Sequence, residues 1–123
     1  MEKAHKKLKV WQEAMSLAKL VYHITEKLPK EEKFGLVIQM RRAAVSIPSN
    51  IAEGAARQGS KESVQFYTIA RGSLSELDTQ VELCKSLELL SSSNVSLLTF
   101  HIDTVDSLLS GFIRYKRRTM SGN

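Results

Sequence analysis

The sequence predicts an all-α fold, namely an antiparallel up-down-up-down bundle of four helices. Apolar residues recur at helical spacing in four segments, and only two prolines and six glycines punctuate the 123 residues. Turn residues are therefore too scarce for a sandwich or barrel of many short strands. With 42% hydrophobic and 25% charged residues, the chain is also too apolar to be disordered. Its length is that of one domain, which we expect to span residues 1–123.

Short breaks separate the four predicted helices, and short connections favour antiparallel neighbours. Pro29 ends the first helix. Gly59 provides a C-terminal glycine for the second helix, and Ser60 provides an N-cap for the third. A serine-rich turn at residues 91–94 (SSSN) caps the fourth. The predicted helices are residues 10–28, 32–57, 60–90 and 94–118.

The apolar faces of the last two predicted helices are those of ordinary bundle helices. At 100° per residue, the apolar side chains of the third helix share one arc of about 160°. They are Phe66, Tyr67, Ile69, Ala70, Leu74, Leu77, Val81, Cys84 and Leu87. The fourth helix is similar, with one apolar face that runs from Leu97 to Ile113.

The first two helices have wider apolar faces. Apolar residues cover about 220° of each helix, which is more than one bundle core can bury. The surplus predicts an exposed apolar patch, and such patches mark interfaces. We therefore expect the chain to associate with copies of itself as a homo-oligomer. The alternative is a tightly wrapped monomer with a few apolar groups on its surface.

The net charge of +5 is concentrated at the two ends of the chain. Residues 1–9 carry a charge of +3 and residues 114–118 carry +4, whereas the body between them carries −2. Because an even number of alternating helices brings both termini to one end of a bundle, the two clusters should combine into one basic region. The clusters consist of Lys3, Lys6, Lys7, Lys9, Arg114, Lys116, Arg117 and Arg118.

Clusters of lysine and arginine bind phosphate backbones through the release of counterions. We therefore predict that these eight residues bind RNA or DNA. Few aromatic residues lie among them, so stacking on bases is not indicated. The alternatives are that the basic ends keep the protein soluble, or that they contact an acidic protein or an anionic membrane surface.

A polar stripe follows one face of the second helix, where a spacing of three or four residues aligns its members. We predict that this stripe is a surface for a protein partner, and the alternative is a solvated helix face. The stripe includes Arg42, Ser46, Asn50, Glu53 and Arg57. Arg41 points instead into the apolar arc, where a buried guanidinium needs a partner. We expect Arg41 to pair with Glu76, within or between subunits.

The sequence contains no recognisable catalytic or metal-binding motif. The one Glu-x-x-His match, at residues 2–5, lies in a terminal segment, and a di-iron bundle needs two such motifs. Cys84 lies on a core face, and no glycine-rich phosphate loop is present. We expect a non-enzymatic protein without cofactors. A single cysteine, no signal peptide and no membrane-spanning segment indicate a cytoplasmic location.

One stretch of the sequence resembles a known family. RRAAVSIPSNIAEGAARQGSKE, at residues 41–62, is similar to the signature of bacterial four-helix bundle proteins, also called 23S rRNA-intervening sequence proteins. Its proline within a helical serine/asparagine segment makes the match specific. The segments VWQEAMSLAKLVY (10–22), EKFGL (32–36) and ARGSLSELDTQ (70–80) also resemble that family. The resemblance implies an antiparallel four-helix bundle that assembles into a ring-like homopentamer, with no catalytic residues.

A second similarity, at the level of architecture alone, connects this family to the accessory proteins of diversity-generating retroelements. Those proteins are basic pentamers that bind a reverse transcriptase and nucleic acid, but a shared fold is weak evidence of function. This similarity implies an alternative function for the chain, as a scaffold or accessory subunit of a nucleic-acid enzyme. In that case the polar stripe of the second helix would contact the partner protein.

Overall fold

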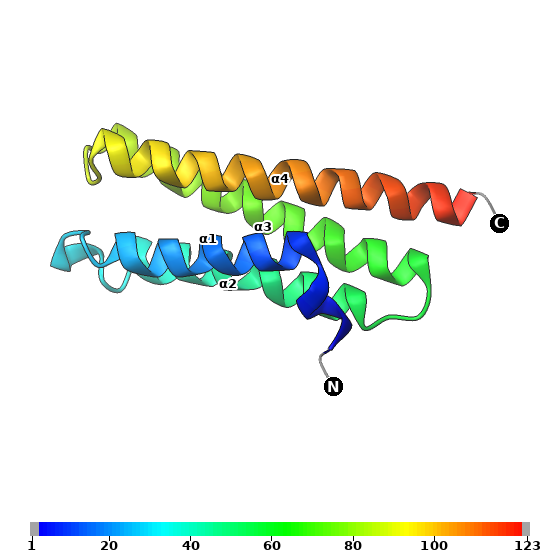
Figure 1. Ribbon diagram of the computed structural model, residues 1–123. Coiled ribbons are helices and arrows are strands. Elements are labelled where there is room, and N and C mark those ends of the chain that lie inside the picture. Colours follow the sequence, from blue (N-terminus) through cyan, green and yellow to red (C-terminus); the bar gives the residue numbers. More distant parts are fainter. Residues whose placement is uncertain (1–2, 122–123) are drawn as a thin grey trace.

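The structure, a computed structural model, describes residues 3–121. These residues form four α-helices and two short 3-10 helices, and they contain no strand. The α-helices lie side by side along a common direction (Figure 1). The predicted all-α fold with four helices is therefore confirmed. The elements are η1 (Ala4–Lys7), α1 (Lys9–Thr25), η2 (Lys30–Glu32), α2 (Leu36–Ala55), α3 (Ser60–Ser86) and α4 (Ser92–Ser121).

Each helix of the bundle packs against two others. Helix α1 contacts α2 and α4, and helix α3 contacts the same two helices. The α1–α2 and α3–α4 connections lie at one end of the bundle, whereas the α2–α3 connection and the last turns of α4 lie at the other (Figure 1). The N-terminal η1 folds back and contacts α2 as well as α1. A hydrogen bond from Gln12 Nε2 to the Lys6 carbonyl, 2.9 Å long, holds η1 against α1.

Helices α1 and α3 end earlier than the sequence predicts, and α2 begins later. Helix α1 ends at Thr25, and the chain passes through a turn and η2 before α2 begins at Leu36. Helix α3 ends at Ser86 because Glu88 adopts a left-handed conformation, with φ of 56°. The Leu89 N–H then donates to the Cys84 carbonyl, at 2.9 Å, in the Schellman pattern that terminates helices. Ser91 caps α4 as expected, because its Oγ accepts the Asn94 N–H at 3.2 Å.

The predicted roles of the residues between α2 and α3 are wrong. Gly59 is not a left-handed C-terminal glycine, because its φ of −96° and ψ of 140° place it at the N-cap position of α3. Ser60 is therefore the first residue of α3 rather than its cap. The two helices are joined instead by Ser63, whose Oγ donates a 2.8 Å hydrogen bond to the Gly54 carbonyl.

The core is one cluster of apolar side chains from all four α-helices, among them the fully buried Leu17, Met40, Leu77 and Leu109. Close packing requires a glycine at position 54, since a Cβ there would lie 2.5 Å from Cε1 of Tyr67. The predicted apolar face of α3 is wrong at two positions. Ile69, on the outer side of the helix, is 52% exposed, and Leu87, just beyond the last residue of α3, is 55% exposed.

Candidate functional site

The two basic segments of the chain lie at the same end of the bundle. A crevice of about 190 Å³ joins them, because its walls come from both segments. Ala4 and Leu8 contribute from the N-terminal segment, and Phe112 and Lys116 contribute from α4. Arg57, at the end of the polar stripe, also lines the crevice. The fold thus brings together two basic segments that are separated by more than 100 positions in the sequence.

The eight predicted phosphate-binding residues are open to solvent at this end. Seven of them are exposed, and Lys116 is half-buried with its Nζ 5.6 Å from the centre of the Phe112 ring. The only salt bridge within residues 3–121 joins Arg57 to Glu53, at 2.9 Å. These eight cations and Arg57 form what we term the basic end. The eight are Lys3, Lys6, Lys7, Lys9, Arg114, Lys116, Arg117 and Arg118.

The polar stripe of α2 is divided by the packing of α3. Ser46 and Asn50 are half-buried between the two helices, where Ser46 Oγ and Ser73 Oγ lie 2.8 Å apart. Asn50 Nδ2 donates to the Ser46 carbonyl at 2.8 Å and to Ser46 Oγ at 3.0 Å. The remaining members, Arg42, Glu53 and Arg57, are exposed. Only these three remain available to a partner, and the Arg57 guanidinium also stacks on the Phe66 ring at 4.6 Å.

The predicted pair of Arg41 and Glu76 is not formed within the chain. Arg41 Nε donates to Thr25 Oγ1 at 3.0 Å, and its Nη2 donates to the Tyr22 carbonyl at 3.2 Å. The guanidinium also stacks on the Tyr22 ring, 4.5 Å from its centre. The physical reason is that carbonyls in the last turn of α1 have no partner within that helix, and a long basic side chain can reach them. Glu76 lies exposed on α3 instead.

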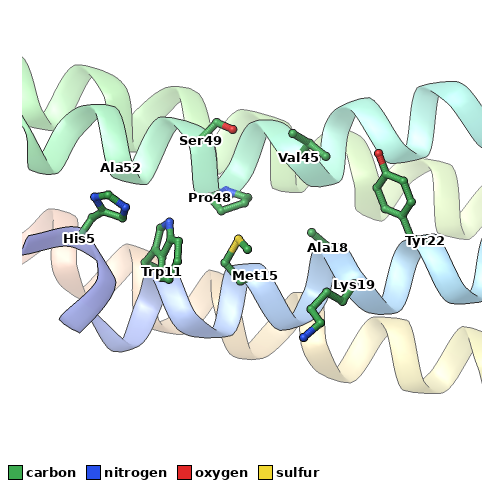
Figure 2. Close-up of a pocket in the computed structure, with 10 residues that line it drawn as sticks. All are labelled: His5, Trp11, Met15, Ala18, Lys19, Tyr22, Val45, Pro48, Ser49 and Ala52. Atoms are coloured by element: carbon green, nitrogen blue, oxygen red, sulfur yellow. The ribbon is translucent and has the colours of Figure 1, made fainter. Parts of the chain in front are cut away.

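An apolar groove runs between α1 and α2 on the outside of the bundle (Figure 2), with a volume of about 520 Å³. Its walls contain the predicted apolar surplus of these two helices. His5 lies at one end, edge-on to the Trp11 ring at 5.0 Å between centres. The sequence does not predict that His5 lies at the groove, because the position of η1 against α1 and α2 depends on contacts between elements. The lining side chains are His5, Trp11, Met15, Ala18, Lys19, Tyr22, Val45, Pro48, Ser49 and Ala52.

The family model described as 23S rRNA-intervening sequence protein matches residues 6–111 of the chain. The chain belongs to this family. The matched region contains every residue that lines the groove except His5, and it ends before the C-terminal basic cluster at residues 114–118. The resemblance of residues 41–62 to the family signature is therefore confirmed.

A solved structure shares the fold of this family member. It is a protein of unknown function from the S23 ribosomal protein family of Bacteroides thetaiotaomicron, with a TM-score of 0.78 and 20% identity. The alignment covers 85% of this chain and 95% of that chain. No curated protein is significantly similar in sequence.

The titratable groups of this family member do not form a metal centre within residues 3–121, where no three His, Cys, Asp or Glu side chains are suitably grouped. Cys84 is buried in the core as predicted, and burial raises the pKa of its thiol. Burial, with the neighbouring carboxylates of Glu82, Asp103 and Asp106, also raises the pKa of Asp78 between α3 and α4. Across the described part of the chain, no helix has the length and apolar character needed to cross a membrane.

Proposed function

We propose that the chain is a non-enzymatic subunit of a ring-like homo-oligomer that binds nucleic acid through its basic end. Each subunit is an antiparallel up-down-up-down bundle. We expect five subunits, the number that the resemblance to the family implies. The family description refers to 23S rRNA, and we propose a structured RNA as the ligand.

The observation that carries this proposal is the convergence of both charged segments of the chain on one crevice, lined by Ala4, Leu8 and Lys116 among others. Arg57 and Lys116 line this crevice, and the other seven cations of the two segments are exposed to solvent. Phosphate groups that bind there release condensed counterions, which favours binding at low salt. A ring multiplies the effect, because linked binding sites on one particle act at a high effective concentration.

Self-association is supported by the apolar groove between α1 and α2. Met15, Tyr22 and Val45 at this face are 38%, 43% and 43% exposed. A groove of about 520 Å³ with nearly all its lining apolar is unusual for a surface that faces only water. A second copy of the chain would remove this surface from water. All the residues that line this groove except His5 lie in the region that the family model matches.

The test is a salt titration of binding to a labelled structured 23S rRNA fragment, followed by fluorescence anisotropy. We expect wild-type binding to weaken steeply as salt increases, because several phosphates are contacted. The triple variant Arg114→Glu, Arg117→Glu, Arg118→Glu should bind at least about tenfold more weakly near 0.1 M salt and show a shallower salt dependence.

A matched control removes the same amount of positive charge from the other end of the bundle. Lys27, Lys30 and Lys33 are exposed at or near the α1–α2 connection, and changing all three to Glu should leave the affinity within about threefold of wild type. Equal losses of affinity in both variants would show that binding depends only on the overall charge of the protein. No detectable binding of the wild type near 0.1 M salt would overturn the nucleic-acid proposal.

The second candidate function is that of a protein-interaction scaffold, such as an accessory subunit of a nucleic-acid enzyme. It is favoured by the exposed Arg42 and by the exposed Glu53–Arg57 pair, which leave one side of α2 polar and accessible. Under this function the Arg114, Arg117 and Arg118 changes would spare partner binding, whereas Glu53→Ala together with Arg42→Ala would abolish it.

A further inference from the structure

On the basis of the self-association proposed above, we propose that the groove between α1 and α2 receives an exposed face of α3 from a second copy of the chain. We term this face the α3 stripe. Its residues recur at spacings of three, four and seven, which places them on one side of the helix. They are Ile69, Gly72, Glu76, Leu83 and Leu87.

The α3 stripe contains apolar side chains that the bundle leaves in water. Ile69, Leu83 and Leu87 are 52%, 45% and 55% exposed. Each could bury about half of its surface against a partner, and the groove provides apolar side chains to receive them. An amphipathic helix that inserts into an apolar groove is a recurrent mode of recognition.

Packing within the chain does not require a glycine at position 72. Gly72 lies in the interior of a 27-residue helix, where glycine is about 1 kcal/mol less favourable than alanine. A Cβ at this position would meet nothing within 4 Å, in contrast to the buried Gly54. A glycine in the N-terminal part of the stripe allows the backbone of a neighbouring helix to approach closely. A contact with a second copy would thus explain the glycine at position 72, which packing within the single chain does not explain.

The charges at the two surfaces are complementary. Glu76 in the stripe accepts a hydrogen bond only from Gln80 Nε2, at 3.3 Å, and has no cationic partner within the described residues. The Arg41 guanidinium, beside Tyr22 at one end of the groove, contacts neutral oxygens and an aromatic ring but no carboxylate. Lys19 lies on the rim of the same groove. Opposite charges at the edge of an apolar contact set its register.

The groove is as long as the C-terminal part of the stripe. Trp11 and Tyr22 mark the groove on α1, and Glu76 and the C-cap residue Leu87 bound this part of the stripe; each pair is eleven residues apart, or about 16 Å of helix. With Glu76 opposite Arg41, Leu83 and Leu87 lie along the groove towards Trp11. Because groove and stripe are different surfaces, the contact is head-to-tail, which produces a ring when it closes rather than a two-fold dimer.

The test is a charge exchange followed by sedimentation equilibrium of the full chain. Glu76→Arg and Arg41→Glu should each weaken assembly at least about tenfold, and the double variant should recover to within about threefold of wild type. Glu82→Arg, on another side of the same helix, is the matched control and should assemble normally. Because Arg41 also caps α1, thermal unfolding of each variant by circular dichroism checks that the subunit stays folded.

The outcomes separate the contact from self-association itself. If the wild type assembles and Glu76→Arg assembles equally well, the α3 stripe is not the occupant of the groove. Loss of assembly by Phe100→Ser but not by Glu76→Arg would move the contact to the exposed apolar pair Leu97 and Phe100 on α4. A wild type that stays monomeric at all concentrations tested would overturn both this contact and the proposed homo-oligomer.

Discussion

The two sides of helix α2 are packed very differently. Towards α3, small and polar side chains fit closely: Gly54 lies under the Tyr67 ring, and Ser46 meets Ser73. Towards α1, bulky side chains such as Trp11 and Met15 face Pro48 across an open groove (Figure 2). Helix α2 thus completes its packing within the chain on the side of α3 and leaves it incomplete on the side of α1. The incomplete side is where a second copy is expected.

The largest effect on stability is expected at the tightest contact between α2 and α3. Gly54→Ala places a Cβ 2.5 Å from the Tyr67 ring, and the ring, which is 1% exposed, has little room to move. Overpacking of this kind lowers the free energy of unfolding by about 1–3 kcal/mol. Urea unfolding followed by circular dichroism measures the loss. Stability equal to wild type would show that the α2–α3 contact is looser than described.

A smaller loss is expected from the polar contact on the same side. Ser46→Ala removes the 2.8 Å contact with Ser73 and one acceptor of the Asn50 amide, which should lower the free energy of unfolding by about 1 kcal/mol. Ser49 lies at the groove instead and is exposed, so Ser49→Ala should change stability by less than about 0.5 kcal/mol. Equal losses from both changes would contradict the difference between the two sides.

A change of opposite sign is expected on the outside of α3. Gly72→Ala should raise the free energy of unfolding of the monomer by about 1 kcal/mol, because alanine favours helix and no atom obstructs its Cβ. The same change should weaken assembly by separating the helices at the proposed contact. Urea unfolding at low protein concentration measures the first effect and sedimentation equilibrium the second. A variant that gains stability and assembles as well as wild type would remove Gly72 from the interface.

The smallest effect concerns the contact of α3 with α4, where carboxylates gather. The pKa of Asp78 is raised in the folded protein by burial and then by Glu82, Asp103 and Asp106. The folded state therefore holds the proton more tightly than the unfolded state, and stability falls as pH rises above the ordinary pKa of aspartate. Asp78→Asn should stabilise the protein at neutral pH and give no such gain at pH values below that pKa. Thermal unfolding across pH, with Asp106→Asn as a variant that relieves part of the same repulsion, measures this difference.

The helical spacing of apolar residues was sufficient to predict the four helices and the exposed apolar side chains on the first two of them. The same spacing assigned Ile69 and Leu87 to the core, because an arc on one helix does not show how much of it the neighbouring helices cover. The partner of Arg41 could not be predicted either. Its bonds to Thr25 and to the Tyr22 carbonyl depend on where α1 ends and on how α2 lies against it.

The candidate site was predicted in part. The charge distribution and an even number of helices were enough to expect both basic clusters at one end of the bundle. Ser46 and Asn50 are half-buried because α3 approaches α2 closely, and they are therefore not available to a partner. The spacing of polar residues along α2 could not predict this burial. The return of η1, which brings His5 to the groove, is likewise a contact between elements.

Native mass spectrometry of the full chain, with and without a structured 23S rRNA fragment, is the most direct test of whether subunits associate through the groove and combine their basic ends on one particle. We predict one assembly whose mass is an integral multiple of the 13.8 kDa subunit, with five subunits expected, and a second peak heavier by one RNA. A single peak at the subunit mass, unchanged when RNA is added, would contradict the account.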